Sequence, residues 1–235
     1  MFLDPTYFLF MIPGVAFMLW AQSKVKGNYK KYSQVRNSFG ITGAEAARRV
    51  LQSVGLGDVE IKPIPGELSD HYDPKTRTLG LSQGVYGAQS IAAIAIAAHE
   101  AGHAIQHASA YGPLKARSAI VPAVKYGSNF GFIVLFLGII AQAPGLAWAG
   151  VALFALSTLF ALVTLPVEFD ASSRAKAALV QVGLVDGGVA GGAESKGVEK
   201  VLDAAAWTYV AGFAASVLTL AYYVMMVSGM SSRRD

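Results

Sequence analysis

Four long apolar stretches constrain the fold of this chain more than any other feature. They cover residues 7–22, 119–141, 146–167 and 207–227. A transmembrane α-helix needs about 20 predominantly apolar residues. The turn QAPG joins the second stretch to the third, and so short a connection favours an antiparallel pair of helices. The pattern therefore predicts a mainly α-helical integral membrane protein with about four transmembrane helices.

The composition agrees with a membrane location. Only 14% of the residues are charged, whereas a soluble domain has about 25%. The chain has no cysteine, so disulfides and thiolate metal sites are excluded and any metal ligands must be His, Asp or Glu. The N-terminal segment MFLDPTY has an aspartate but no lysine or arginine. Since secretory signals begin with a positive region, the first stretch is predicted to be a retained span.

The positive charges are distributed unevenly around the four stretches. Of the 19 lysines and arginines, 13 lie between Lys24 and Lys125, which is near the start of the second stretch, four lie between the third stretch and the fourth, and two follow the fourth. The positive-inside rule then places residues 23–118 and 168–206 in the cytoplasm and both termini outside. The basic cluster directly after the first stretch is interpreted as this topology signal, with contact to anionic lipid. Nucleic-acid binding is not expected.

Two helices are predicted in the region 23–118. Thr42 and Glu45 have the spacing of a capping box, so one helix should begin near Gly43. Ser90 is a suitable N-cap for a second helix over residues 91–109. Together with short strands, these helices predict a small α+β cytoplasmic part.

Three short strands are predicted between those helices. The first lies near residues 59–61 and should be stopped by Pro63 and Pro65. The other two flank a turn at Asp73-Pro74. The strand at 76–81 is predicted either to be an edge that pairs with an extended peptide or to belong to a simple hairpin that covers the helix.

The segment AAHEAGHAIQH, residues 97–107, contains three of the four histidines. His99, Glu100 and His103 form the pattern HExxH, and positions i and i+4 share one face of a helix. Two imidazoles on that face can bind one cation, and Glu100 is placed as the general base that acts on a zinc-activated water. The small residues Ala101 and Gly102 should leave room for metal and substrate. One Zn²⁺ per chain is predicted, and the small α+β part around this helix is expected to be zincin-like. The alternative is a helix whose histidines are hydrogen-bonded residues of the core.

A catalytic zinc usually has three protein ligands. His107 shares the helical face, but two turns, about 12 Å, separate it from His99. It is therefore predicted to face the substrate or support the site, with plain packing as the alternative. Glu168 is the predicted third ligand because two spans return the chain to the same side of the membrane. The alternative for Glu168 is an ion pair with Arg174.

Two other side chains remain candidates for the third ligand. Asp186, in the glycine-rich loop 183–197, occupies a position that resembles the aspartate of site-2-type intramembrane proteases. His71 precedes the turn at residues 73–74 and is expected to lie beside the cleft or in the turn. The alternative for Asp186 is an ordinary loop residue.

Two segments resemble a known family. They are SDHYDPKTRTLGLSQGVYGAQSIAAIAIAAHEAGHAIQH and LPVEFDASSRAKAAL, and they are similar to the YugP-type membrane zinc metallopeptidases of bacteria, the neutral zinc metallopeptidase family. The resemblance covers essentially the whole chain. It implies a bacterial inner-membrane zinc peptidase in which His99, His103 and Glu168 hold the ion and Glu100 is the base.

The chain is more distantly similar to the HtpX and CAAX prenyl protease gluzincins. In the HtpX group an aspartate lies four residues after the ligand glutamate and supports a ligand histidine. That position is Ser172 here, and the nearby acid is Asp170, on a different helical face. The same support is therefore not expected, unless the helix begins irregularly.

The leading functional hypothesis is a zinc-dependent membrane endopeptidase that cleaves membrane-associated or misfolded polypeptides at the cytoplasmic face. The alternatives are a site-2-like intramembrane protease, a non-catalytic zinc-binding scaffold or adaptor, and a transporter. An oxyanion donor is needed beside the zinc, and the sequence does not rank the candidates Tyr72, Tyr86, Arg174 and His107. The cleavage specificity, a homo-oligomer and a membrane-protein partner are left open.

Overall fold

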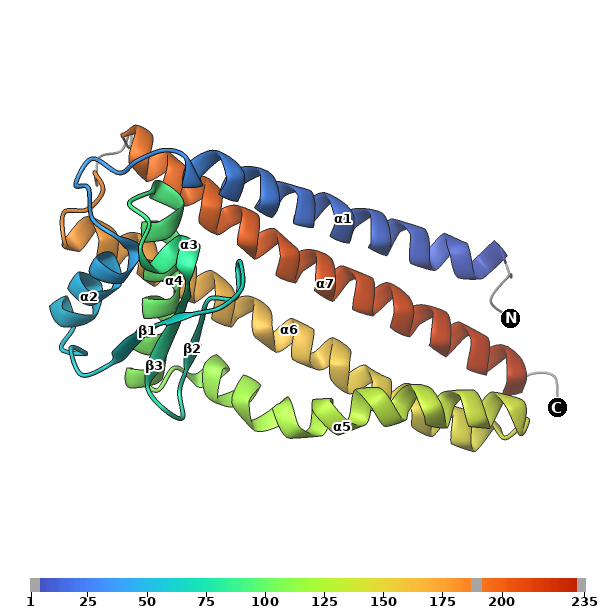
Figure 1. Ribbon diagram of the computed structural model, residues 1–235. Coiled ribbons are helices and arrows are strands. Elements are labelled where there is room, and N and C mark those ends of the chain that lie inside the picture. Colours follow the sequence, from blue (N-terminus) through green and yellow to red (C-terminus); the bar gives the residue numbers. More distant parts are fainter. Residues whose placement is uncertain (1–4, 187–191, 232–235) are drawn as a thin grey trace. The chain divides into compact units, whose positions relative to one another are not determined.

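The computed structural model describes residues 5–186 and 192–231, and these residues are mainly helical (Figure 1). Residues 187–191 of the predicted glycine-rich loop lie outside the described part. In chain order the elements are α1 (Pro5–Ser33), α2 (Gly43–Ser53), β1 (Glu60–Ile64), β2 (His71–Asp73), β3 (Thr78–Ser82), α3 (Gln83–Tyr86), α4 (Ile91–Ala108), α5 (Gly112–Ile140), α6 (Pro144–Gln181) and α7 (Ala193–Ser231). The described chain divides into two compact units.

The first unit contains the apolar helical segments 5–21, 115–166 and 208–231. Helices α1, α6 and α7 are long and apolar enough to cross a membrane, and α5 adds a fourth span if its two pieces count as one. Within this unit, Gly138 of α5 and Gly150 of α6 leave no room for a Cβ against the backbone of the other helix. Small residues of this kind let membrane helices approach closely. The prediction of a mainly helical chain is confirmed, with three to four helices that could span a membrane.

The second unit contains residues 22–114 and, within the described chain, the parts of 167–207 on either side of the gap. Its sheet has the order β1-β3-β2, with β1 parallel and β2 antiparallel to β3. Helix α2 packs against α4, and α4 contacts β2 and β3 (Figure 1). The core of this unit includes the buried side chains of Leu51, Leu79, Ile94, Leu179 and Leu202. The helix with the HExxH pattern is therefore enclosed by the rest of its unit.

The two predicted N-caps are present. The Thr42 hydroxyl accepts a hydrogen bond from the Glu45 backbone N–H, and the Glu45 carboxylate accepts one from the Thr42 backbone N–H, at 3.2 and 2.7 Å. The Ser90 hydroxyl accepts from the backbone N–H of Ala93 at 3.1 Å. Each bond satisfies a backbone donor that has no partner inside its helix. Local chemistry therefore determines where α2 and α4 begin.

Two details of the strand predictions were wrong, although β2 and β3 do form the alternative that was predicted, a hairpin against the helix. Strand β1 continues through Pro63 to Ile64, because it is an edge strand, where a missing backbone N–H can be tolerated. Strand β3 is not an edge, since it pairs with β1 on one side and with β2 on the other. An extended peptide cannot add beside β3. The edges of this sheet are β1 and β2.

Helix α6 is continuous from Pro144 to Gln181, across Pro166. The residues that follow Pro166 therefore lie on a regular helix in the second unit. Glu168 and Ser172 are four residues apart and share one face, as do Asp170 and Arg174. This periodicity decides which of these side chains can meet α4.

Candidate metal centre

Three predicted ligands converge in the second unit. His99 and His103 come from α4 and Glu168 from α6, and one ligand atom of each lies within 4.8 Å of the others. The Glu168 Oε2 atom is 3.3 Å from Nε2 of His99 and 3.6 Å from Nε2 of His103. The two imidazole rings are nearly perpendicular, at 84°. Within residues 5–186 and 192–231, no other three His, Asp or Glu side chains form such a group.

Gly102 lets the two ligand-bearing helices approach each other. A Cβ at this position would lie 2.5 Å from the backbone oxygen of Ala171 on α6. The close contact brings Glu168, one turn earlier on α6, beside His99 and His103. The sequence had suggested that Gly102 leaves room for metal and substrate. In the structure it leaves room for the backbone of α6.

We expect Gly102→Ala to destabilise the protein and to weaken metal binding. Overpacking typically costs about 1–3 kcal/mol, which exceeds the gain of at most about 1 kcal/mol from placing alanine in a helix. The melting temperature and the zinc content of the purified protein would be measured. Gly27→Ala on α1 is the matched control, because a Cβ at Gly27 meets nothing within 4 Å. Wild-type values for Gly102→Ala would contradict this explanation of the helix contact.

Each candidate histidine ligand has a hydrogen-bond partner on its second ring nitrogen. The Ser172 hydroxyl lies 3.1 Å from Nδ1 of His99, and the Gln106 side-chain oxygen lies 3.0 Å from Nδ1 of His103. When Nδ1–H donates to these oxygens, each Nε2 keeps its lone pair on the side of Glu168. Position 172, where the sequence has no acid, thus supplies a hydroxyl that contacts a candidate ligand histidine.

Asp170 contributes to the site through another residue. Its carboxylate accepts a hydrogen bond from the Gln106 amide at 2.8 Å and forms an ion pair with Arg174. Arg174 thus pairs with Asp170 rather than in the predicted alternative with Glu168. Sequence reasoning missed the roles of Gln106 and Ser172. Gln106 lies three residues after His103, and Ser172 lies four residues after Glu168. These spacings become informative only once the packing of α4 on α6 is known.

Glu100 is buried, with 8% of its surface exposed. Burial raises the pKa of its carboxyl above the ordinary value, and the neighbouring His99 and His103 offset only part of that rise. Burial acts to lower the pKa of His103, but the Glu168 and Glu100 carboxylates outweigh it, so that the pKa is raised. A buried set of two imidazoles and one carboxylate, with an acid beside it, fits a zinc ion.

His107 and Tyr72 form a polar pair near this group. The Tyr72 hydroxyl lies 2.9 Å from Nδ1 of His107, and the ring centroids are 5.8 Å apart. His107 lies one helical turn beyond His103, and Tyr72 comes from the edge strand β2. His71, the preceding residue of β2, is exposed and its Nδ1 lies 3.0 Å from the backbone oxygen of Ser69. The structure therefore brings Tyr72, and not His71, to the helix that carries the site.

Asp186 lies apart from the three converging residues. It follows the end of α6, is exposed, and is not a member of the metal-ligand group. Residues 187–191 of its loop lie outside the described chain. The structure thus favours Glu168 over Asp186 as the partner of the two histidines.

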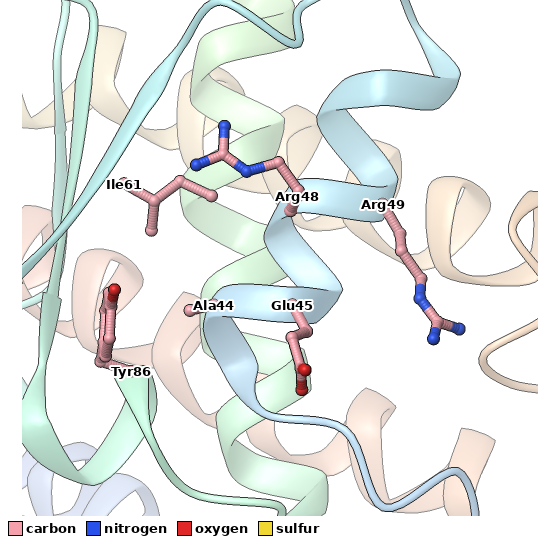
Figure 2. A pocket seen from close by; sticks show the side chains of 6 residues that line it. All are labelled: Ala44, Glu45, Arg48, Arg49, Ile61 and Tyr86. Carbon is pink, nitrogen blue, oxygen red and sulfur yellow. The ribbon is translucent and has the colours of Figure 1, made fainter.

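A separate surface pocket of about 380 Å³ lies on the second unit, and its lining residues include no candidate ligand. Figure 2 shows the side chains that line it, Ala44, Glu45, Arg48, Arg49, Ile61 and Tyr86. Two of its charged groups already serve the fold, since Glu45 caps α2 and Arg48 donates to the backbone oxygen of Val59. The chemistry of the candidate site is therefore concentrated on α4 and α6.

The comparisons with known proteins agree with this geometry. The family model described as "Putative neutral zinc metallopeptidase" matches residues 7–228. The "Putative membrane protease YugP" of Bacillus subtilis (strain 168) is 45% identical over 220 residues, which cover 93% of this chain and 96% of that protein. No solved structure matches the chain. The resemblance found in the sequence is confirmed, and the chain belongs to the "Putative neutral zinc metallopeptidase" family.

Proposed function

We propose that this protein is a zinc-dependent membrane endopeptidase with one Zn²⁺ per chain, held by His99, His103 and Glu168. The observation that carries the proposal is the convergence of three ligand atoms within 4.8 Å, with Glu100 buried beside them. Membership of a zinc metallopeptidase family supports the same reaction class. The substrates would be membrane-associated or misfolded polypeptides.

Bound zinc would lower the pKa of a water molecule to about 7 and polarise the scissile carbonyl. Glu100 takes a proton from the attacking water as the new C–O bond forms. It then gives that proton to the leaving amine as the C–N bond breaks. Burial favours this role, because a raised pKa makes the Glu100 carboxylate a stronger proton acceptor. The test is the variant Glu100→Gln, which should keep zinc and lose hydrolysis.

Tyr72 and His107 are assigned a role in binding the substrate. Their hydrogen-bonded pair lies one turn beyond His103 and brings an edge-strand hydroxyl next to the helix of the site. When Nδ1–H of His107 donates to the Tyr72 oxygen, the Tyr72 O–H stays available and would stabilise negative charge on the carbonyl oxygen of a bound peptide. Arg174 is less suited to that task, since its guanidinium already pairs with Asp170.

The site is proposed to lie on the cytoplasmic side of the bacterial inner membrane, with both termini outside. Support comes from the charge distribution, in which 17 of the 19 lysines and arginines lie between Lys24 and Lys125 or between Arg174 and Lys200. A reporter that is active only outside the cytoplasm is therefore expected to be active when fused after Asp235. The same reporter fused to a chain truncated after Ser109 should be inactive. The reverse pattern would overturn the proposed topology.

A further inference from the structure

Gln106 connects the two ligand-bearing helices through one completely buried side chain. Its exposed fraction is 0%. Its Oε1 accepts from Nδ1 of His103 at 3.0 Å, while its Nε2 donates to the backbone oxygen of Val167 at 2.7 Å and to Asp170 at 2.8 Å. Val167 immediately precedes Glu168 on α6. One amide therefore bonds to a ligand histidine on α4 and to the backbone next to the ligand carboxylate on α6.

The orientation of this amide follows from its partners. The Val167 carbonyl oxygen has no proton to donate, and the Asp170 carboxylate is paired with the Arg174 guanidinium. A flipped amide would direct Oε1 against two acceptor oxygens. The NH₂ group of Gln106 must therefore face Val167 and Asp170, and Oε1 must face His103.

The same reasoning assigns the tautomer of His103. An amide oxygen can only accept a hydrogen bond, so Nδ1 of His103 must carry a proton, and in the neutral ring Nε2 then keeps its lone pair. The partner of His99 differs, because the Ser172 hydroxyl can donate or accept. Of the two candidate ligand histidines, only His103 therefore has a tautomer that its surroundings impose.

We propose that Arg174, Asp170 and Gln106 form a positioning chain that selects the metal-binding tautomer of His103 and thereby sets the zinc affinity of the site. The inference rests on the proposed function only in taking His103 as a zinc ligand. The outer end of this positioning chain is the side chain of Arg174, which is partly exposed. Its guanidinium lies 3.5 Å from the Ser109 hydroxyl and over the ring of Tyr111. These residues act through His103 and are positioning residues.

The positioning chain is tested by reversing the direction of the hydrogen bond between Gln106 and Asp170. Gln106→Glu removes the donor and directs a carboxylate oxygen at Val167 and Asp170. The repulsion should move this side chain away from Nδ1 of His103. Zinc affinity should then fall about 10–100-fold, the usual effect of losing an outer partner of a ligand histidine. In the double variant Gln106→Glu/Asp170→Asn, the amide introduced at position 170 can donate to the carboxylate introduced at position 106. That carboxylate can still accept a hydrogen bond from His103. Much of the lost affinity should therefore return. A general loss of packing would not be rescued in this way.

The measurement is zinc affinity of the purified full-length protein in detergent, by competition with a chromogenic chelator. Asn37→Asp is the matched control, because Asn37 is also a buried amide of this unit, bonded to the backbone of Ile41. It should lower the melting temperature and leave zinc affinity unchanged. Wild-type affinity in Gln106→Glu, or a double variant as weak as that single variant, would overturn the inference. A wild-type protein that binds no zinc would overturn the proposed metal site as well.

Discussion

Glu100→Gln is expected to lower the rate of peptide hydrolysis by about 10²–10⁴-fold, the usual contribution of a general base. Glutamine has nearly the same shape, but its amide cannot take a proton from water. Zinc content should stay at about one ion per chain, since Glu100 is not a member of the ligand group. The two measurements are cleavage of a labelled unfolded polypeptide and elemental analysis of the same preparation.

The matched control for that experiment is Glu199→Gln. Glu199 is exposed on α7 in the same unit, so its substitution should change neither cleavage nor zinc content. Cleavage by Glu100→Gln at the wild-type rate would refute the assigned role of Glu100. A wild-type protein that holds zinc but cleaves no polypeptide would favour the scaffold or adaptor alternative.

Glu168→Ala should remove most of the zinc. Losing only an outer hydrogen-bond partner of a ligand costs about 10–100-fold in affinity, and loss of a ligand itself should cost more. Glu168 is buried, with 2% of its surface exposed, so neither solvent nor a mobile side chain easily replaces its carboxylate. Zinc per chain and the chelator-competition affinity would be compared with those of the wild-type protein.

Asp186→Ala is the comparison that separates the two protease hypotheses. Asp186 is exposed and outside the ligand group, so this variant should keep its zinc. The opposite result, with zinc lost in Asp186→Ala and kept in Glu168→Ala, would favour the site-2-like arrangement. Loss of zinc in both variants would mean that the end of α6 and its following loop act together.

The sequence by itself determined the features that depend on local chemistry. Helix α4 begins after Ser90 because a hydroxyl there accepts from the backbone N–H of Ala93. The i, i+4 spacing then puts His99 and His103 on one face, whatever surrounds the helix. The apolar stretches predicted membrane helices by length and composition, since a bilayer sets the length that a helix must have. The even number of predicted spans between them made Glu168 a candidate partner of the histidines.

Only the tertiary structure decided what those side chains contact. Gln106 and Ser172 have ordinary sequence positions, and they become partners of His103 and His99 because Gly102 lets α4 lie against the backbone of α6. Similarly, β3 became the central strand through its pairing with β1, which no local propensity specifies. Hydrogen bonds between segments tens of residues apart depend on the packing of whole elements. Periodicity indicates which face a side chain occupies, but the packing decides which partner it meets.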